Sequence, residues 1–309
     1  MIGHSLEYVK NVAHADERLF DLASHLGRLV TESLLEEVYT TPKPGLVDCY
    51  SNGSHRDMCL ATFERSAAAL EPYFVQMART GSRMIGQEEE IFDRIREIGK
   101  EAEREMYRAT GGVNTHKGLI FSMGILCTAA AICIRKRSVV TIKELIYFEQ
   151  KMVRNRLIQE LEQIEQREGH DSNGEKLYCK QGVLGVRGEA LSGYSSVISY
   201  ALPVMTEGMQ KGRDYNLVKL QTLFTIMSRA EDSNILARQD EKTLEYVQEL
   251  AGNFLKLGGA YQIDAIGKCK EMDAVFIRKN ISPGGCADLL AITIFLREVL
   301  YEYGRKDLF

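Results

Sequence analysis

Apolar residues recur at three- and four-residue steps along most of the chain. The stretch after residue 140 is typical, with Ile142, Leu145, Ile146, Met152 and Val153 on this period. Such spacing places apolar side chains on one face of an α-helix. No run with a two-residue period and a hairpin turn stands out, so the sequence predicts an all-α protein. Helices are expected over 5–39, 58–79, 87–108, 117–135, 141–167, 189–209, 215–230, 242–256, 259–279 and 284–303.

No linker, internal repeat or low-complexity segment divides the pattern. We therefore expect one large multi-helix catalytic domain at 28–309, preceded by an N-terminal extension at 1–27 that is also helical. The run 118–134 is nearly apolar, but its 17 residues fall short of the roughly 20 that cross a bilayer. It also contains Ser122 and Thr128. A buried core helix is expected there.

Charge and cysteine content narrow the function classes. Lys plus Arg is 39 and Asp plus Glu is 43, which excludes a general nucleic-acid binder because that would need a basic excess. None of the seven cysteines forms a C-x-x-C pair, so no zinc or thioredoxin-type site is indicated. The first residues lack a signal-peptide pattern. A cytoplasmic protein without a membrane span is expected.

The glycine-containing polar segments lie between the expected helices. They mix Gly with Lys, Arg, His and Asp, and they occupy 41–48, 52–57, 111–118, 185–190, 231–234 and 282–288. Loops on a rigid scaffold normally carry binding and catalytic groups. The active-site cleft is therefore expected where these inter-helix loops meet.

Two of these segments favour anions. Pro44 holds Lys43 in an extended turn, where the lysine could meet a phosphate and Asp48 a metal or hydroxyl group. The alternative is a proline stop with solvated charges. In 111–118 two glycines and an Asn-Thr-His-Lys run precede an apolar helix, whose N-terminus favours an anion beside Lys117 and His116. Here the alternative is a glycine-rich helix cap formed by Thr115.

The segment 282–288 is typical of a helix start, with Ser282 as N-cap and Pro283 in the first helical position. Gly284 and Gly285 each cost about 1 kcal/mol there relative to alanine. They fit either the close approach of a ligand or tight packing of helices. Asp288 would lie just over one turn into the helix.

The remaining two segments have both functional and structural interpretations. Arg187, between glycines, could fork onto a phosphate, and Glu189 could hold Mg²⁺ or simply complement the helix dipole. Asp232 and Ser233 offer oxygen ligands in a turn, but either could equally be an N-cap.

Taken together, the segments resemble the ATP:dephospho-CoA triphosphoribosyl transferase family. The resemblance covers residues 28 to 300 and leaves the first 25 or so unmatched. It rests on the order of several motifs, namely TPKPGLVD (41–48), SHRDM (54–58), SAAAL (66–70) with PYF (72–74), GVNTHKG (112–118), RGEA (187–190), DSN (232–234) and SPGGCADLL (282–290). Ser233 and Cys286 stand where threonine and serine are more usual in the family.

The resemblance implies a transfer of the 5-triphosphoribosyl group of ATP to the 2′-hydroxyl of 3′-dephospho-CoA, with release of adenine. The product would be the prosthetic-group precursor of citrate lyase, or alternatively of malonate decarboxylase. It would be passed to the transferase that assembles the holo acyl carrier protein. ATP is then a substrate, Mg²⁺ is the expected cofactor, and a homodimer is compatible with the resemblance.

The residue types required by this reaction are all present. Catalytic roles fall to Asp48, Asp57, Glu189 and His116. Substrate and phosphate binding falls to Lys43, His55, Arg56, Asn114, Thr115, Lys117, Arg187, Ser282, Gly284 and Gly285. Metal binding falls to Asp232, Asp288, Asp48 and Glu189. The spacing does not decide which carboxylate is the general base.

Two other function classes use the same residues. One is an Mg²⁺-dependent ribosyl hydrolase or nucleotide phosphotransferase, which would release a sugar phosphate or ADP instead of adenine. The other is a non-enzymatic helical interaction protein, which does not need so many Gly, His, Lys, Arg and Asp residues in its loops.

Overall fold

The computed structural model describes residues 2–84, 86–167, 169 and 172–305, with side chains described outside 2–18, 89 and 173. The described chain folds into α-helices and contains no strand, as the sequence predicts. The helices are α1 (Ile2–Tyr39), α2 (Leu60–Arg83), α3 (Glu88–Thr110), α4 (Lys117–Lys136), α5 (Ile142–Gln166), α6 (Asn173–Gln181), α7 (Val186–Leu191), α8 (Leu202–Gln210), α9 (Tyr215–Met227), α10 (Ser233–Arg238), α11 (Glu241–Lys256), α12 (Ala265–Lys279) and α13 (Gly284–Tyr303), with a π-helical turn at Val197–Ala201 and a 3₁₀ turn at Gly259–Tyr261.

Two predicted helices have wrong bounds, and two short helices are not predicted. The expected helix over 189–209 is interrupted between α7 and α8, because Gly193 and Tyr194 have φ values of 67° and 55°. The buried Tyr194 ring makes this turn part of the core. The helix expected from 259 begins only after Asp264, which has φ 61°. The short helices α6 and α10 are not predicted, since neither is long enough to show a periodic pattern.

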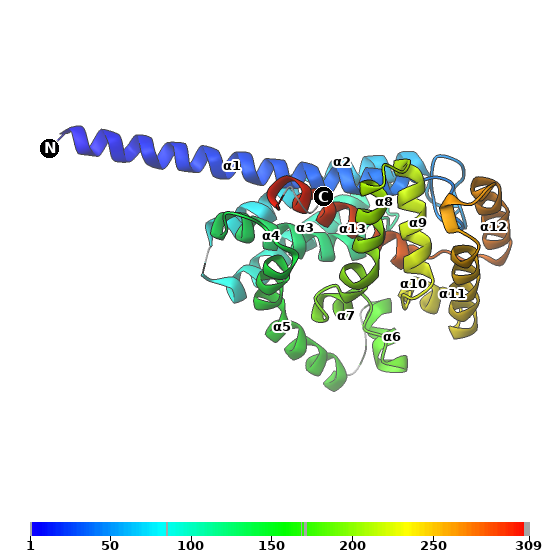
Figure 1. The fold of residues 1–309 in the computed structure, drawn as a ribbon. Coiled ribbons are helices and arrows are strands. Elements are labelled where there is room, and N and C mark those ends of the chain that lie inside the picture. The colour runs from blue at the N-terminus through cyan, green and yellow to red at the C-terminus, as the bar shows by residue number, and fades with distance from the viewer. Residues whose placement is uncertain (1, 85, 168, 170–171, 306–309) are drawn as a thin grey trace.

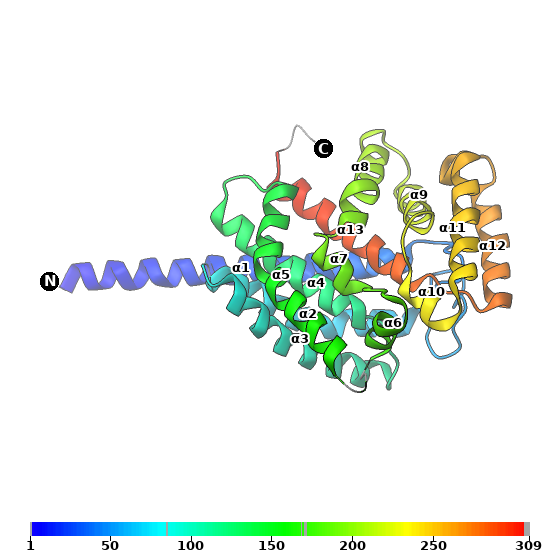
Figure 2. The ribbon, with the colours of Figure 1, turned by 90° about the horizontal axis from the view of Figure 1, so that it is seen from below.

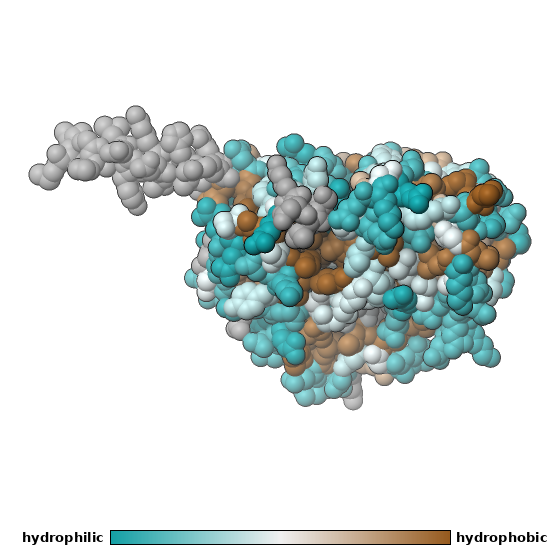
Figure 3. Space-filling model, viewed as in Figure 1, coloured by the Kyte–Doolittle hydropathy of each residue, from teal (hydrophilic) through white to brown (hydrophobic). Residues whose placement is uncertain are grey.

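The core is built around α4 and α13. Fourteen of the 20 residues of α4 are buried, and twelve of the 20 in α13. By length and composition α4 could cross a membrane, but 78% of its apolar window is packed inside the fold. This confirms the expected core helix. The face drawn in Figure 3 is mostly hydrophilic, with several apolar patches among the hydrophilic residues.

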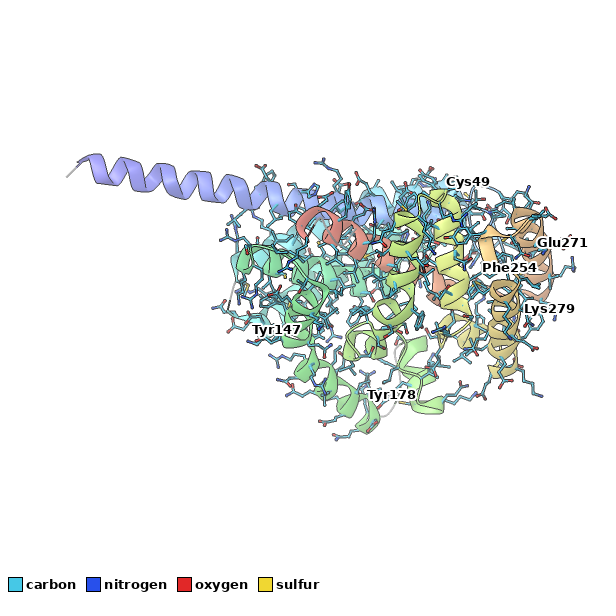
Figure 4. The ribbon with its side chains drawn as sticks, viewed as in Figure 1. Cys49, Tyr147, Tyr178, Phe254, Glu271 and Lys279 are labelled. Carbon is cyan, nitrogen blue, oxygen red and sulfur yellow. The ribbon has the colours of Figure 1, made fainter. Side chains whose placement is uncertain are left out.

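The helices form layers around this core. The long α1 lies against α2 along one side, and its first turns extend away from the rest of the molecule (Figures 1 and 2). At the opposite end α11 and α12 lie side by side (Figure 2). Phe254 of α11 packs on Phe224 of α9 with ring centroids 4.1 Å apart, which joins this end to the core (Figure 4). Tyr178 of α6 bonds Glu165 of α5 at the lower edge (Figure 4).

The loop after α1 is fixed against α12 and the segment that follows it. Gly45 donates its N–H to Asp273 Oδ1 at 2.9 Å and has φ 73°. A Cβ at this position would lie 2.3 Å from the carbonyl oxygen of Ile281. The turn therefore requires glycine both for its conformation and for the close approach of another backbone.

The Gly45→Ala variant is expected to lose roughly 2–5 kcal/mol of folding free energy, from a left-handed residue that carries a Cβ and from overpacking. Gly252→Ala is the matched control. It lies inside α11, where an added Cβ would meet nothing within 4 Å. That variant is expected to gain up to about 1 kcal/mol from helix propensity. Urea denaturation of both variants checks the pair, and equal stabilities would contradict the proposed role of Gly45.

Candidate functional site

A cavity of about 1030 Å³ opens where α3, α4, α7, α10 and α13 converge. Thirteen of the sixteen residues that the sequence places in the site line it. These thirteen are Lys43, His55, Asn114, Thr115, His116, Lys117, Arg187, Glu189, Asp232, Ser282, Gly284, Gly285 and Asp288. Loops that are far apart in the sequence therefore share one cavity.

The other three, Asp48, Arg56 and Asp57, do not line this cavity. Asp48 is buried in its own turn, where its carboxylate accepts backbone N–H groups from Tyr50 at 2.6 Å and Ser51 at 2.9 Å. Arg56 is exposed, and the Asp57 side chain is 65% exposed. Asp48 thus shapes a loop, and the other two lie outside the enclosed space.

Asp232 joins the N-termini of α10 and α13. Its Oδ1 caps α10 by accepting N–H groups from Asn234 and Ile235, at 2.9 and 3.1 Å. Its Oδ2 accepts the Cys286 N–H of α13 at 2.8 Å. The N-cap residue of α13 is Pro283 and not the predicted Ser282, and it offers no side chain to accept this N–H. The helix itself begins at Gly284, as the helical period predicts. Ser282 is therefore free to pair with His55 Nε2 at 2.8 Å.

The two glycines of α13 are explained by helix packing. A Cβ on Gly284 would lie 3.0 Å from the Asn234 amide, and one on Gly285 would lie 3.1 Å from the Asp232 carboxylate. Of the two alternatives left open by the sequence, close contact between helices accounts for both residues. It also places the first turn of α13 directly on the cavity wall.

The N-terminus of α4 is held by side chains from the loop before it. Thr115 donates its hydroxyl to Ser66 Oγ at 2.7 Å instead of capping the helix, and His116 occupies the N-cap position. His116 Nδ1 also lies 2.7 Å from Ser66 Oγ. Asn114 Oδ1 accepts the Lys117 N–H at 3.2 Å. These bonds aim the positive end of the α4 dipole at the cavity.

The surroundings of His116 and His55 lower the pKa of both rings and so favour their neutral forms. Burial, together with the Lys43 charge, lowers the pKa of His116 to about 3. Burial and the nearby Arg238 also lower the pKa of His55. Each ring can therefore donate or accept a hydrogen bond but does not carry a positive charge to the substrate.

Two cavity carboxylates have oxygens without a protein partner. Within the described residues, no group donates a hydrogen bond to Asp288. Glu189 bonds Ser196 through Oε1 at 2.5 Å, but its buried Oε2 has no donor. Burial raises the pKa of Asp288 well above the usual aspartate range, and the charges of Glu37 and Asp232 raise it further. Burial also raises the pKa of Glu189.

The predicted cations are present but already paired. Lys117 lies 2.5 Å from Glu103, and Arg187 lies 2.8 Å from Glu160. Of these two carboxylates, Glu103 lines the cavity and Glu160 does not. Lys43 is different, because it is only 1% exposed and its ammonium group bonds both the carbonyl and the carboxylate of Glu37.

Sequence reasoning missed five further residues near the site, namely Glu37, Ser66, Arg96, Lys100 and Arg238. Four of them line the cavity, and Ser66 supports His116 from behind it. All five lie inside helices and not in the polar loops. For α3, a cavity-facing stripe of polar residues at helical spacing is a usable signal, because Arg96, Lys100, Glu103 and Tyr107 recur at steps of four, three and four.

Comparison with known proteins gives one consistent result. The profile of a family described as ATP:dephospho-CoA triphosphoribosyl transferase matches residues 23–307. A 2-(5''-triphosphoribosyl)-3'-dephosphocoenzyme-A synthase of Pectobacterium atrosepticum is 39% identical over 89% of this chain and 87% of its own. A probable synthase of the same name from Vibrio cholerae is 36% identical over 92% and 90%.

A third relative is longer than this chain. Protein CitXG of Leuconostoc mesenteroides is 37% identical over 86% of this chain but only 57% of its own length. No solved structure matches the chain.

Proposed function

The chain belongs to the ATP:dephospho-CoA triphosphoribosyl transferase family, and we propose that it transfers the triphosphoribosyl group of ATP to dephospho-CoA within the cavity between α3, α4, α7, α10 and α13. The main support for this site is that thirteen of the predicted residues line the same cavity. A polyphosphate needs cations and helix N-termini, and the reacting sugar needs carboxylates. The cavity wall contains all of these.

In this proposal the step is a substitution at the anomeric carbon of the ATP ribose. The 2′-oxygen of dephospho-CoA forms the new bond to that carbon and gives its proton to a base. The bond to adenine breaks, and adenine leaves with the electron pair and takes up a proton. Positive charge develops on the ribose as in glycoside cleavage, so nearby carboxylates stabilise the transition state. Asp288 and Glu189 are the cavity carboxylates with oxygens free for this purpose.

We assign the triphosphate to Lys117, Arg187 and the N-terminal turns of α4 and α13. Lys117 is the first residue of α4 and Arg187 the second residue of α7, and each helix follows a glycine-containing loop. The α4 turn adds backbone N–H groups and a positive dipole end. Asn114, His55 and Ser282 add neutral hydrogen-bonding groups to the same wall. Asp232 holds the α13 turn in place through Cys286.

The residues present fit an Mg²⁺ ion. Within the described residues, no three His, Cys, Asp or Glu side chains are grouped to hold a metal alone. Mg²⁺ is usually bound by one or two carboxylates together with substrate phosphates, so a prearranged cage is not needed. Asp288 and Glu189 would hold the ion, because Asp232 and Asp48 use their oxygens on backbone N–H groups. The ion would neutralise phosphate charge beside these carboxylates.

Adenine release that requires both ATP and dephospho-CoA is the expected result with the purified protein and Mg²⁺. Chromatographic separation of bases from nucleotides measures it, and omission of dephospho-CoA is the control. ADP as the product would support a phosphotransferase, and adenine without dephospho-CoA would support a hydrolase. No turnover and no ATP binding would favour an interaction protein. Each of these three outcomes would overturn the proposal.

We further propose that the product is the prosthetic-group precursor of citrate lyase and that the protein acts in the cytoplasm. The first proposal rests on the family resemblance alone. The second is supported by seven cysteines without a disulfide, of which Cys127, Cys133, Cys269 and Cys286 are buried as free thiols. Transfer of the purified product to apo-citrate lyase or to apo-malonate decarboxylase distinguishes the two pathways.

A further inference from the structure

The cavity-facing side of α3 carries charged residues that the triphosphate assignment does not use. Arg96, Gly99, Lys100 and Glu103 all line the cavity and lie on one face of the helix. Glu103 is the partner of Lys117, so the lower part of this face adjoins the proposed triphosphate site. Lys100 lies one turn earlier on the helix, and Arg96 two turns earlier.

Gly99 is not required by packing within the chain. An added Cβ would meet only Met77 Cε at 3.6 Å and Ile120 Cγ2 at 3.9 Å, which are ordinary contacts. Gly124 of α4 provides the contrast, since its Cβ would lie 2.6 Å from Met77 Sδ. Glycine is among the least favourable residues in a helix interior. A glycine on a cavity wall with room beside it lets a ligand approach the helix backbone closely.

The two cations on either side of Gly99 keep donors available. Arg96 gives one nitrogen to Glu160 at 2.5 Å, and a guanidinium has five N–H donors. Glu160 is shared with Arg187, which also lies 3.9 Å from Glu175. Lys100 is 57% exposed and lies 2.7 Å from Glu97. Two cations one turn apart suit a ligand with two adjacent phosphates.

The wall beside these cations is apolar. Phe92, Ile95, Ile120 and Phe121 line the cavity next to Gly99 and Arg96. A phosphate chain that ends in water does not need such a surface, whereas a diphosphate that continues into a partly apolar arm does. Of the two substrates, dephospho-CoA has this chemistry, because its diphosphate is joined to the pantetheine arm.

We propose that the α3 face formed by Arg96, Gly99 and Lys100 binds the diphosphate and the adjoining pantetheine of dephospho-CoA. The phosphates lie between the two cations, and the arm passes over Gly99 toward Ile95 and Ile120. This inference rests on the proposed transferase function. It adds a second polyphosphate subsite, separate from the Lys117 and Arg187 pair.

Steady-state kinetics of two variants test it. Gly99→Leu fills the space over the helix backbone, and Lys100→Met removes one cation while keeping the length of the side chain. Each is expected to raise KM for dephospho-CoA about tenfold, since a hydrogen bond to a charged group has roughly that effect on affinity. KM for ATP should change by less than about threefold.

Arg104→Met is the matched control. It lies one turn after Lys100 on α3, is 73% exposed and does not line the cavity. Both KM values should stay at wild-type levels in this variant. Circular dichroism and thermal denaturation confirm that each variant is folded, and Lys100→Met keeps the test decisive if Gly99→Leu does not fold.

The outcomes separate this inference from the function on which it rests. If the wild-type protein releases no adenine, the transferase function fails. If the wild type is active and both variants keep its KM for dephospho-CoA, only the α3 subsite is wrong. An increase in KM for ATP alone would assign the α3 face to ATP, and equal increases in both KM values would show that the face does not distinguish the two substrates; either result would overturn the inference.

Discussion

Asp288→Asn is expected to slow adenine release by about a hundredfold or more, the range for loss of a group that acts on the transition state. The carboxylate lies on the cavity wall and receives no hydrogen bond from the described residues, so the change to asparagine breaks no hydrogen bond of the fold. Burial raises the pKa of Asp288 above its unfolded value. The ionised group therefore costs stability once the pH rises above that unfolded value. The neutral amide removes this cost, and the variant should melt at the same or a higher temperature.

Adenine chromatography and differential scanning calorimetry at pH 7 measure the two effects. Asp57→Asn is the control variant. The sequence predicts a catalytic role for Asp57, whereas the structure places its side chain outside the cavity. It should retain near wild-type turnover. Glu189→Gln should raise the Mg²⁺ concentration needed for half-maximal rate. Wild-type turnover in Asp288→Asn would remove that carboxylate from the chemistry.

The helical period predicted the fold class and the long helices, because those elements bury one continuous apolar face. It failed where a single backbone conformation decides the outcome. The left-handed turn at Gly193 and Tyr194 divides α7 from α8, although apolar residues continue on both sides of it. In the same way Asp264 delays the start of α12. The spacing of apolar residues does not reveal such a turn, because it continues on both sides.

The site was predictable where loops carry the functional groups. The motifs around Lys117, Arg187 and Asp288 converge as expected, since each precedes or opens a helix that points at the same cavity. What the sequence could not show is how each oxygen is used. Asp232 and Asp48 accept backbone N–H groups, whereas Asp288 accepts none. That distinction depends on which helix ends meet in three dimensions.

The buried pair of Lys43 and Glu37 gives the largest expected effect on stability. Lys43 was predicted to bind phosphate, but its ammonium group is 1% exposed and bonds Glu37. Lys43→Met leaves a buried carboxylate without its partner, which should cost roughly 3–5 kcal/mol. Lys219 also faces Glu37 and offsets part of this loss, whereas Asp48 adds to it. Urea denaturation at pH 7 measures the change.

The way in which the stability of Lys43→Met changes with pH shows whether the unpaired Glu37 charge causes the loss. Burial raises the pKa of Glu37 above its unfolded value of 4.5 even with Lys43 present. Without Lys43 the folded pKa rises further, so the unfolded state releases its proton first and stability falls as the pH increases above about 4.5. The deficit of Lys43→Met relative to the wild type should therefore be small at pH 4.5 and grow toward pH 7. A deficit that does not change with pH would mean that lost packing is the cause.

The double variant Glu37→Gln with Lys43→Met removes both charges and should recover most of the stability at pH 7, since a neutral pair of similar volume needs no counter-charge. Its KM for ATP should stay within about threefold of the wild type, because a lysine that is 1% exposed has no surface for a phosphate. A double-mutant cycle in urea gives the coupling energy, and ATP titration gives the affinity. If stability returned while KM for ATP rose about tenfold or more, Lys43 would be a phosphate ligand as the sequence predicts, and the pair would serve binding as well as folding.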